Sequence, residues 1–216
     1  EFQQITEYPE KGVEALLRSH IQFMPNVHFI FSGSKKHVME EMFTSAKRPF
    51  YQSTQIIVLT EIPLENYYSF AHSFFAKEKR ELTLETFSYL YQLENGHTWY
   101  VQSILNRLYE KKINPIDNRL VDRCINDILD EQETIYQSNL TLLTNNQVDL
   151  LKAIATEGCI KNINANDFIK KHHLKTPSSV NVALKSLLNK ELIYNTPDGY
   201  IVYDRFFGKW LKDAVI

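Results

Sequence analysis

Three helical segments followed by a hairpin occupy the last third of the sequence. Apolar residues recur at helical spacing as far as Gly158, and two more helical segments follow at 164–172 and 178–190. Two β-rich runs then flank Asp198-Gly199, a pair that is typical of a tight turn between strands. Helices and hairpin in this order predict a C-terminal winged helix-turn-helix, which we expect over residues 141–216.

The third of these helices, from Pro177 onward, is the usual groove-reading element of a winged helix. Its candidate exposed face carries the residues that we predict to contact nucleic acid, Ser178, Ser179, Asn181 and Lys185. Few lysines lie on this helix or just before it, so the phosphate-binding patch is modest. A winged helix that packs against protein is an equal alternative, and Asp198 at the wing tip favours it slightly.

The net charge of −2 is unevenly distributed along the chain. Residues 1–140 hold 14 basic and 19 acidic side chains, whereas residues 141–216 hold 10 and 7. Only the last third of the chain therefore has an electrostatic reason to approach nucleic acid.

The first sixty residues contain two candidate parallel strands. Residues 27–31 form a β-branched and aromatic run, and an amphipathic helix at about 11–24 leads into it. Residues 55–59 form a second such run. A helix that feeds a buried strand implies a βαβ unit, so Ser34 would lie at the carboxyl edge of a parallel sheet, where such folds bind ligands. The alternative is that Ser34 only caps a helix at about 35–43.

The middle of the chain predicts four helices, at about 64–76, 83–93, 97–112 and 117–138. Asn95-Gly96 would end the second of them, and the free amides at the start of the third would then be able to face a nucleotide. The alternative is a plain turn between two helices. Arg48 has the chemistry to clamp a phosphate or act as an arginine finger, and its alternative is a surface role.

Three short stretches in fixed order carry a further resemblance: Glu1-Phe2-Gln3-Gln4, Phe29-Ile30-Phe31-Ser32-Gly33-Ser34 and Asn95-Gly96-His97-Thr98-Trp99-Tyr100. With the winged helix, they make nearly the whole chain similar to the AAA+/STAND-type ATPases of the archaeal-ATPase kind. In that family an Asp-Glu-Phe-Gln pattern ends the Walker B strand, and a Gly-Ser after the next strand is sensor 1. A Gly-His-Pro-Trp-Tyr-like motif lies in the helical lid, where this chain has Thr98 in place of Pro.

The resemblance implies a fold that is mainly α with α/β. It would comprise a partial P-loop ATPase core with a parallel sheet over 1–62, a helical lid over 63–140 and the winged helix. By the same resemblance Glu1 is the catalytic residue that positions water, Ser34 senses the γ-phosphate, and Gly96 with His97 makes the lid contact. ATP and Mg²⁺ would be the cofactors of the whole protein.

The Gly-x-x-x-x-Gly-Lys-Ser/Thr loop that cradles phosphates does not occur in these residues. We therefore expect the chain to be a truncated portion of an ATP-binding regulator, with no cofactor bound and no catalysis of its own. Two other classes of function stay open, a non-catalytic DNA-binding protein and a module that binds protein or associates with itself.

The remaining composition bears on location and metals. No apolar run approaches the length of about 18 residues that crosses a membrane, so no membrane partner is expected. Cys124 and Cys159 are far apart in sequence and fit a reducing compartment, which predicts a cytoplasmic protein. The seven histidines fit packing or surface roles, so no metal site is predicted.

Overall fold

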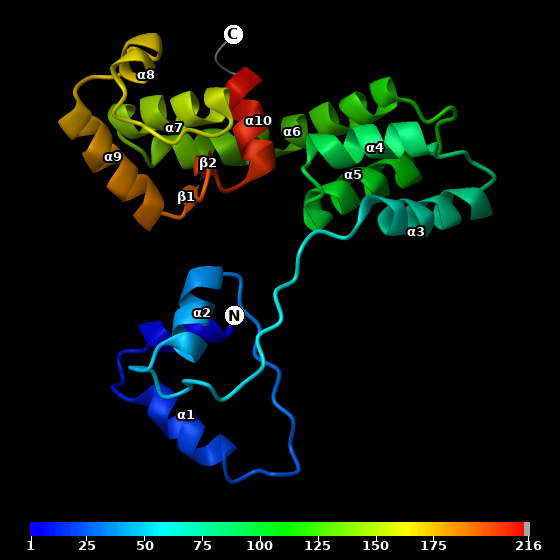
Figure 1. The fold of residues 1–216 in the computed structure, drawn as a ribbon. Coiled ribbons are helices and arrows are strands. Elements are labelled where there is room, and N and C mark those ends of the chain that lie inside the picture. Colours follow the sequence, from blue (N-terminus) through cyan, green and yellow to red (C-terminus); the bar gives the residue numbers. More distant parts are fainter. Residues whose placement is uncertain (214–216) are drawn as a thin grey trace. The chain divides into compact units, whose positions relative to one another are not determined.

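The structure, a computed structural model, describes residues 1–213 as helices with one small sheet (Figure 1). The prediction of a mainly helical fold is confirmed. The chain divides into two compact units, residues 1–60 and the residues from Glu61 onward. Within the described part of the chain, no helix combines the length and the apolar character that a membrane crossing requires.

The first unit is built around a small aromatic core. It contains a 3-10 helix, η1 (Phe2–Glu7), and two α-helices, α1 (Val13–Ile21) and α2 (Lys36–Thr44). Phe43 and Phe50 are buried, and the ring of Phe31 lies 5.6 Å and 5.5 Å from theirs. Burial of these rings is what fixes the loop that ends at Phe31 against α2, because aromatic side chains dominate the energetics of so small a core.

The two predicted strands do not form in this structure. Residues 27–31 and 55–59 form no strand, and the described residues contain no parallel sheet. Ile30 is 95% exposed and Leu59 is 90% exposed, although both runs were expected to be buried. An apolar run becomes a strand only when a neighbouring strand takes its N–H and C=O groups, and these two runs pair neither with each other nor with another described segment.

The second unit begins with four helices, α3 (Leu64–Lys77), α4 (Leu84–Leu93), α5 (Thr98–Lys111) and α6 (Asn118–Thr141). Two of them, α4 and α6, begin after side-chain caps that satisfy otherwise unpaired amides. Thr83 Oγ1 accepts from the amide of Thr86 at 3.2 Å, and Asp117 Oδ1 accepts from the amide of Leu120 at 2.8 Å. These caps explain why the predicted starts of α4 and α6 lie close to those observed.

The winged-helix elements follow in the predicted order. They are α7 (Asn145–Glu157), α8 (Asn166–Lys171), α9 (Pro177–Asn189), β1 (Ile193–Thr196), β2 (Gly199–Val202) and a closing helix α10 (Arg205–Asp213). The strands are antiparallel, with Ile193 opposite Val202 and Thr196 opposite Gly199. Gly199 is required there, because its φ is +143° and a Cβ would lie 2.5 Å from the Ile160 backbone.

One hydrophobic core runs through the whole second unit. It joins buried residues of α3, α4 and α5 to those of the winged helix, from Tyr67 to Leu211. Helix α10 packs against both α6 and α7 (Figure 1). The ring of Tyr136 on α6 lies 5.0 Å from Phe207 and 5.5 Å from Trp210. The four helices and the winged helix therefore fold as one body, because they share the same buried surface.

Candidate functional site

Glu1 and Ser34 lie together in the first unit. Ser34 Oγ donates to Glu1 Oε2 at 2.9 Å, and Gln3 Nε2 donates to the same oxygen. The amide of Phe2 also donates to the Ser32 carbonyl at 2.8 Å, which fixes the two segments side by side. Hydrogen bonds from Gln3 and then from Ser34 hold the pKa of the Glu1 carboxyl below its usual value, so Glu1 is a carboxylate at neutral pH.

Ser34 does not cap the following helix, which was the alternative role for it. The N-cap of α2 is Lys35, and its side chain makes no capping hydrogen bond. The hydroxyl of Ser34 is exposed and turned to the carboxylate. A carboxylate and a hydroxyl that lie side by side on the surface can together bind a water molecule or a polar ligand.

Arg48 is held by two other carboxylates of the same unit. Its Nη1 lies 2.7 Å from Glu14 Oε1, and its Nε lies 3.2 Å from Glu41 Oε1. Arg48 also lines an open groove of about 370 Å³ at the start of α1, and neither Glu1 nor Ser34 belongs to that lining. The structure thus gives Arg48 a structural partner, Glu14, that the sequence did not indicate.

Gly96 and His97 form the turn between α4 and α5 in the second unit. Asn95 and Gly96 have φ values of +45° and +68°, and the Gly96 amide donates to the Tyr91 carbonyl at 2.8 Å. This is the pattern of a helix ended by a left-handed residue. A Cβ on Gly96 would lie 2.5 Å from the Tyr91 hydroxyl oxygen, so the close approach also requires glycine.

His97 is the N-cap residue of α5 and uses no side-chain hydrogen bond to cap it. Partial burial of its ring and then the charge of Arg205 lower the pKa of His97, so it is neutral at pH 7. Trp99 follows it and is 60% exposed. A neutral imidazole and an open indole at a helix start offer a flat ligand two stacking surfaces beside free amides.

The predicted nucleic-acid residues lie on α9, and the structure separates them into two roles. Ser178, Asn181 and Lys185 are exposed along one face of the helix. Ser179 instead belongs to the helix cap, since it receives a hydrogen bond from the Thr176 amide at 3.1 Å and donates to the Thr176 carbonyl at 2.9 Å. Asn181 Oδ1 accepts from Asn164 Nδ2 at 3.1 Å, which leaves the amide N–H₂ group as its donor.

One local ion-pair network near α9 neutralises part of the positive charge there. Glu157 Oε1 lies 2.7 Å from Lys171 Nζ and 2.6 Å from His172 Nε2, and these two partners lower the pKa of Glu157. Lys175 and Lys185 make no ion pair within residues 1–213. Lys185 lies on the exposed face of α9 and is therefore a cation that can meet phosphate there.

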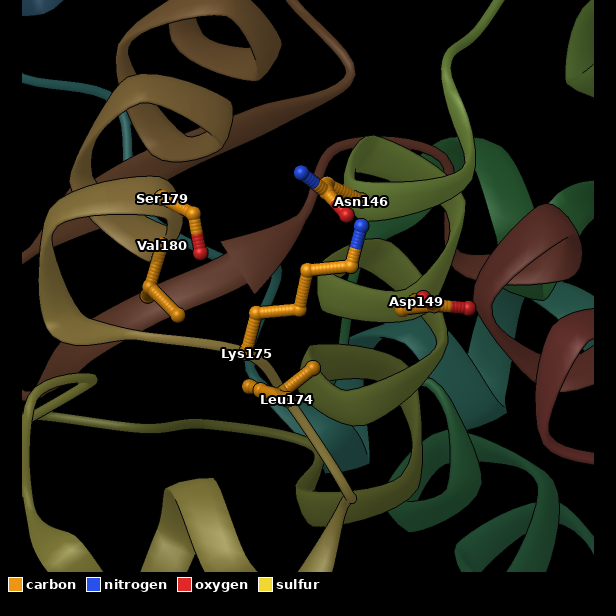
Figure 2. A pocket seen from close by; sticks show the side chains of 6 residues that line it. All are labelled: Asn146, Asp149, Leu174, Lys175, Ser179 and Val180. Atoms are coloured by element: carbon orange, nitrogen blue, oxygen red, sulfur yellow. The ribbon is translucent and has the colours of Figure 1, made fainter.

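The hollow between the starts of α7 and α9 is small. Figure 2 shows Lys175 extending toward Asn146, with Ser179 and Val180 on the facing helix. The cavity measures about 10 Å³, which is at most the space of one water molecule. A nucleotide does not fit there, so any ligand of α9 must bind on its open face.

Two further features are the possible metal ligands and a buried cluster around Glu94 that the sequence did not indicate. No group of three or more acidic, histidine or cysteine side chains that could hold a metal ion occurs in the described part of the chain. Sequence reasoning missed Glu94, which is 0% exposed, and its neighbours Arg205 and Lys209 on α10. The signal available was the four-residue spacing of Arg205 and Lys209, which places both on one face of a helix.

Comparison with known proteins supports the fold. A family model described as "Probable winged helix domain" matches residues 134–213. A solved structure of a Walker-type ATPase from Pyrococcus abyssi is similar to 97% of this chain, with a TM-score of 0.62 and 18% sequence identity. The match covers 61% of that protein, so the chain spans about three fifths of its length. No curated protein matches the sequence.

The two matches agree with the order of elements. The family model begins within α6 and ends at the last residue that the structure describes. The structural match extends over the first unit as well. The chain therefore carries a winged-helix domain within a fold that it shares with a Walker-type ATPase.

Proposed function

We propose that this chain is the ATPase-associated, winged-helix portion of a cytoplasmic, nucleotide-dependent regulator, and that α9 binds duplex DNA. The observation that carries the proposal is the exposed polar face of α9, with Ser178, Asn181 and Lys185 in line. A helix with this face, preceded by a helix-turn and followed by a wing, is the geometry that enters a major groove.

ATP with Mg²⁺ is the proposed ligand of the whole protein. Glu1 and Ser34 fit a part of such a site, because a carboxylate and a hydroxyl meet there at 2.9 Å. Glu1 would orient the attacking water, Ser34 would contact the γ-phosphate, and Gly96 with His97 would face the nucleotide from the lid. Bound ATP would supply the phosphoryl group whose state the regulator senses. The apolar runs 27–31 and 55–59 would then belong to a parallel sheet completed by further strands.

The DNA proposal can be tested by the salt dependence of binding. Fluorescence anisotropy of a labelled duplex should show a log-log slope against salt concentration that becomes shallower by about 0.9 in Lys185→Ala. Lys212→Ala, a change at an exposed lysine on α10, is the matched control and should leave the slope unchanged. Equal slopes for the two variants would count against α9 as the DNA-binding element.

A protein partner for α9 is the second candidate, because of one apolar side chain. Val182 lies on the exposed face of α9 between Asn181 and Lys185 and is 70% exposed. On DNA, an isolated valine can distinguish bases only by contact with a thymine methyl group. An exposed apolar side chain is better suited to a protein interface. DNA affinity that is no tighter than nonspecific charge attraction, unchanged by Asn181→Ala, would favour this second function.

A further inference from the structure

The turn between α4 and α5 is attached to α10 through its backbone. Arg205 Nη1 donates to the Glu94 carbonyl at 2.7 Å, and Lys209 Nζ donates to the Leu93 carbonyl at 3.5 Å. These are among the carbonyls that the end of α4 leaves without helical partners, so positive side chains there also oppose the helix dipole. The last helix of the winged helix thus caps the end of α4.

Tyr100 makes a second attachment on the first turn of α5. Its hydroxyl accepts from the Arg205 amide at 3.0 Å and donates to Asp204 Oδ1 at 3.4 Å. Asp204 Oδ1 also accepts from the amides of Phe206 and Phe207, at 2.9 Å and 3.1 Å, and so caps the start of α10. The start of α10 therefore depends on the position of α5.

The carboxylate of Glu94 is the weak point of this contact. Both of its oxygens are buried without a hydrogen-bond partner, and Lys209 Nζ lies 3.4 Å from Oε1, close enough for an ion pair. The other charged group that acts on it is Arg205 on α10, which also lowers the pKa of His97 at the start of α5. A buried carboxylate that is paired with one partly exposed lysine costs more hydration than it recovers.

We infer that the turn 94–97 and the α10 residues Arg205 and Lys209 form a latch that is held closed against the buried charge of Glu94. The closed latch fastens the winged helix to the start of α5, and opening returns Glu94 to water. The backbone hydrogen bonds favour the closed state and the carboxylate opposes it, so the charge of Glu94 lowers the free energy needed to open the latch. The latch forms without nucleotide or DNA. It connects the turn 94–97, the proposed nucleotide contact, to the winged helix, the proposed DNA contact.

The two sides of the Glu94–Lys209 contact give opposite expectations, which makes the latch testable. Glu94→Gln removes the buried charge and should slow hydrogen exchange of the α10 amides at pH 7 by about threefold or more. Lys209→Met removes the partner of that charge and should speed the same exchange by about threefold or more. Lys212→Met, at an exposed position on the same helix, should change it by less than twofold, that is by roughly 0.4 kcal/mol.

An ordinary stabilising ion pair would give another result, because removal of either partner would then weaken the contact. Faster exchange in both Glu94→Gln and Lys209→Met, or no change in either, overturns the latch. Exchange of the α3 amides, measured in the same spectra, separates local opening of α10 from loss of the whole fold. Neither outcome depends on DNA binding or on a nucleotide, so the latch and the proposed function fail separately.

Discussion

Tyr100→Phe tests the attachment of α10 to α5, because it removes only the hydroxyl group that makes this attachment. The variant keeps the ring, which lies 4.9 Å from Phe206, and removes only the hydroxyl. Burial raises the pKa of Tyr100 to about 12, so the hydroxyl is neutral and able to donate at every pH used in folding experiments. The substitution therefore removes hydrogen bonds and leaves the charge of the protein unchanged.

The size of the effect follows from the two hydrogen bonds. Each is worth about 0.5–1.5 kcal/mol net, and the bond to Asp204 is the longer and weaker of the two. The Arg205 amide is left without its acceptor in a partly buried position, which adds to the loss. We expect Tyr100→Phe to lower the free energy of unfolding by about 1–2 kcal/mol.

Urea denaturation, followed by circular dichroism and by tryptophan fluorescence, measures this directly. With a slope of about 2 kcal/mol per molar, the midpoint should fall by about 0.5–1 M. The control is Tyr89→Phe, because the Tyr89 hydroxyl donates to Asp122 at 2.7 Å on the exposed surface and should contribute less than about 0.5 kcal/mol. Equal midpoints for the two variants would refute the idea that the Tyr100 hydroxyl joins α5 to α10.

Three other substitutions probe the second unit, each followed by urea denaturation. Gly96→Ala should cost about 1–3 kcal/mol, because φ is +68° and the new Cβ meets the Tyr91 hydroxyl; a cost near zero would contradict the turn geometry. Leu187→Ala should cost about 2–5 kcal/mol by leaving a cavity in the winged-helix core, and a loss below about 1 kcal/mol would place Leu187 outside it. Burial raises the pKa of Glu94 above 4.5, so as the pH falls the folded state takes up this proton at a higher pH than the unfolded state does. The charged carboxylate therefore destabilises the wild-type fold at high pH. Glu94→Gln should be more stable than wild type at pH 8, and the difference should shrink toward pH 5. A stability difference that is constant with pH, or reversed, would show that the charge of Glu94 does not destabilise the fold.

The winged helix could be predicted because its signals are local. The Asp198-Gly199 turn and the helical periodicity before it depend on neighbours in sequence, and the hairpin forms at that turn. The proximity of Glu1 and Ser34 agrees with the expected order of the two segments, although it arises without a sheet. Their roles toward nucleotide stay predictions.

The strands at 27–31 and 55–59 and the residues around Glu94 could not be predicted for one shared reason. Each depends on partners far away in the chain. The apolar runs have strand composition, but a strand also needs a paired neighbour, and neither run is paired. Glu94 looks like a solvated residue at a helix end, and only the arrival of Arg205, more than one hundred residues later, makes it part of a buried contact.

Helix α6 has a consequence for how this domain can be inherited. It is 24 residues long, about 36 Å, and its Tyr136 belongs to the same packed surface as Phe207 and Trp210. The family match starts at residue 134, inside that helix. Residues 134–141 are only the last third of α6, so a gene segment cut at residue 134 would divide the helix and expose the surface that it packs against. We therefore expect the winged helix to be inherited together with the whole of α6.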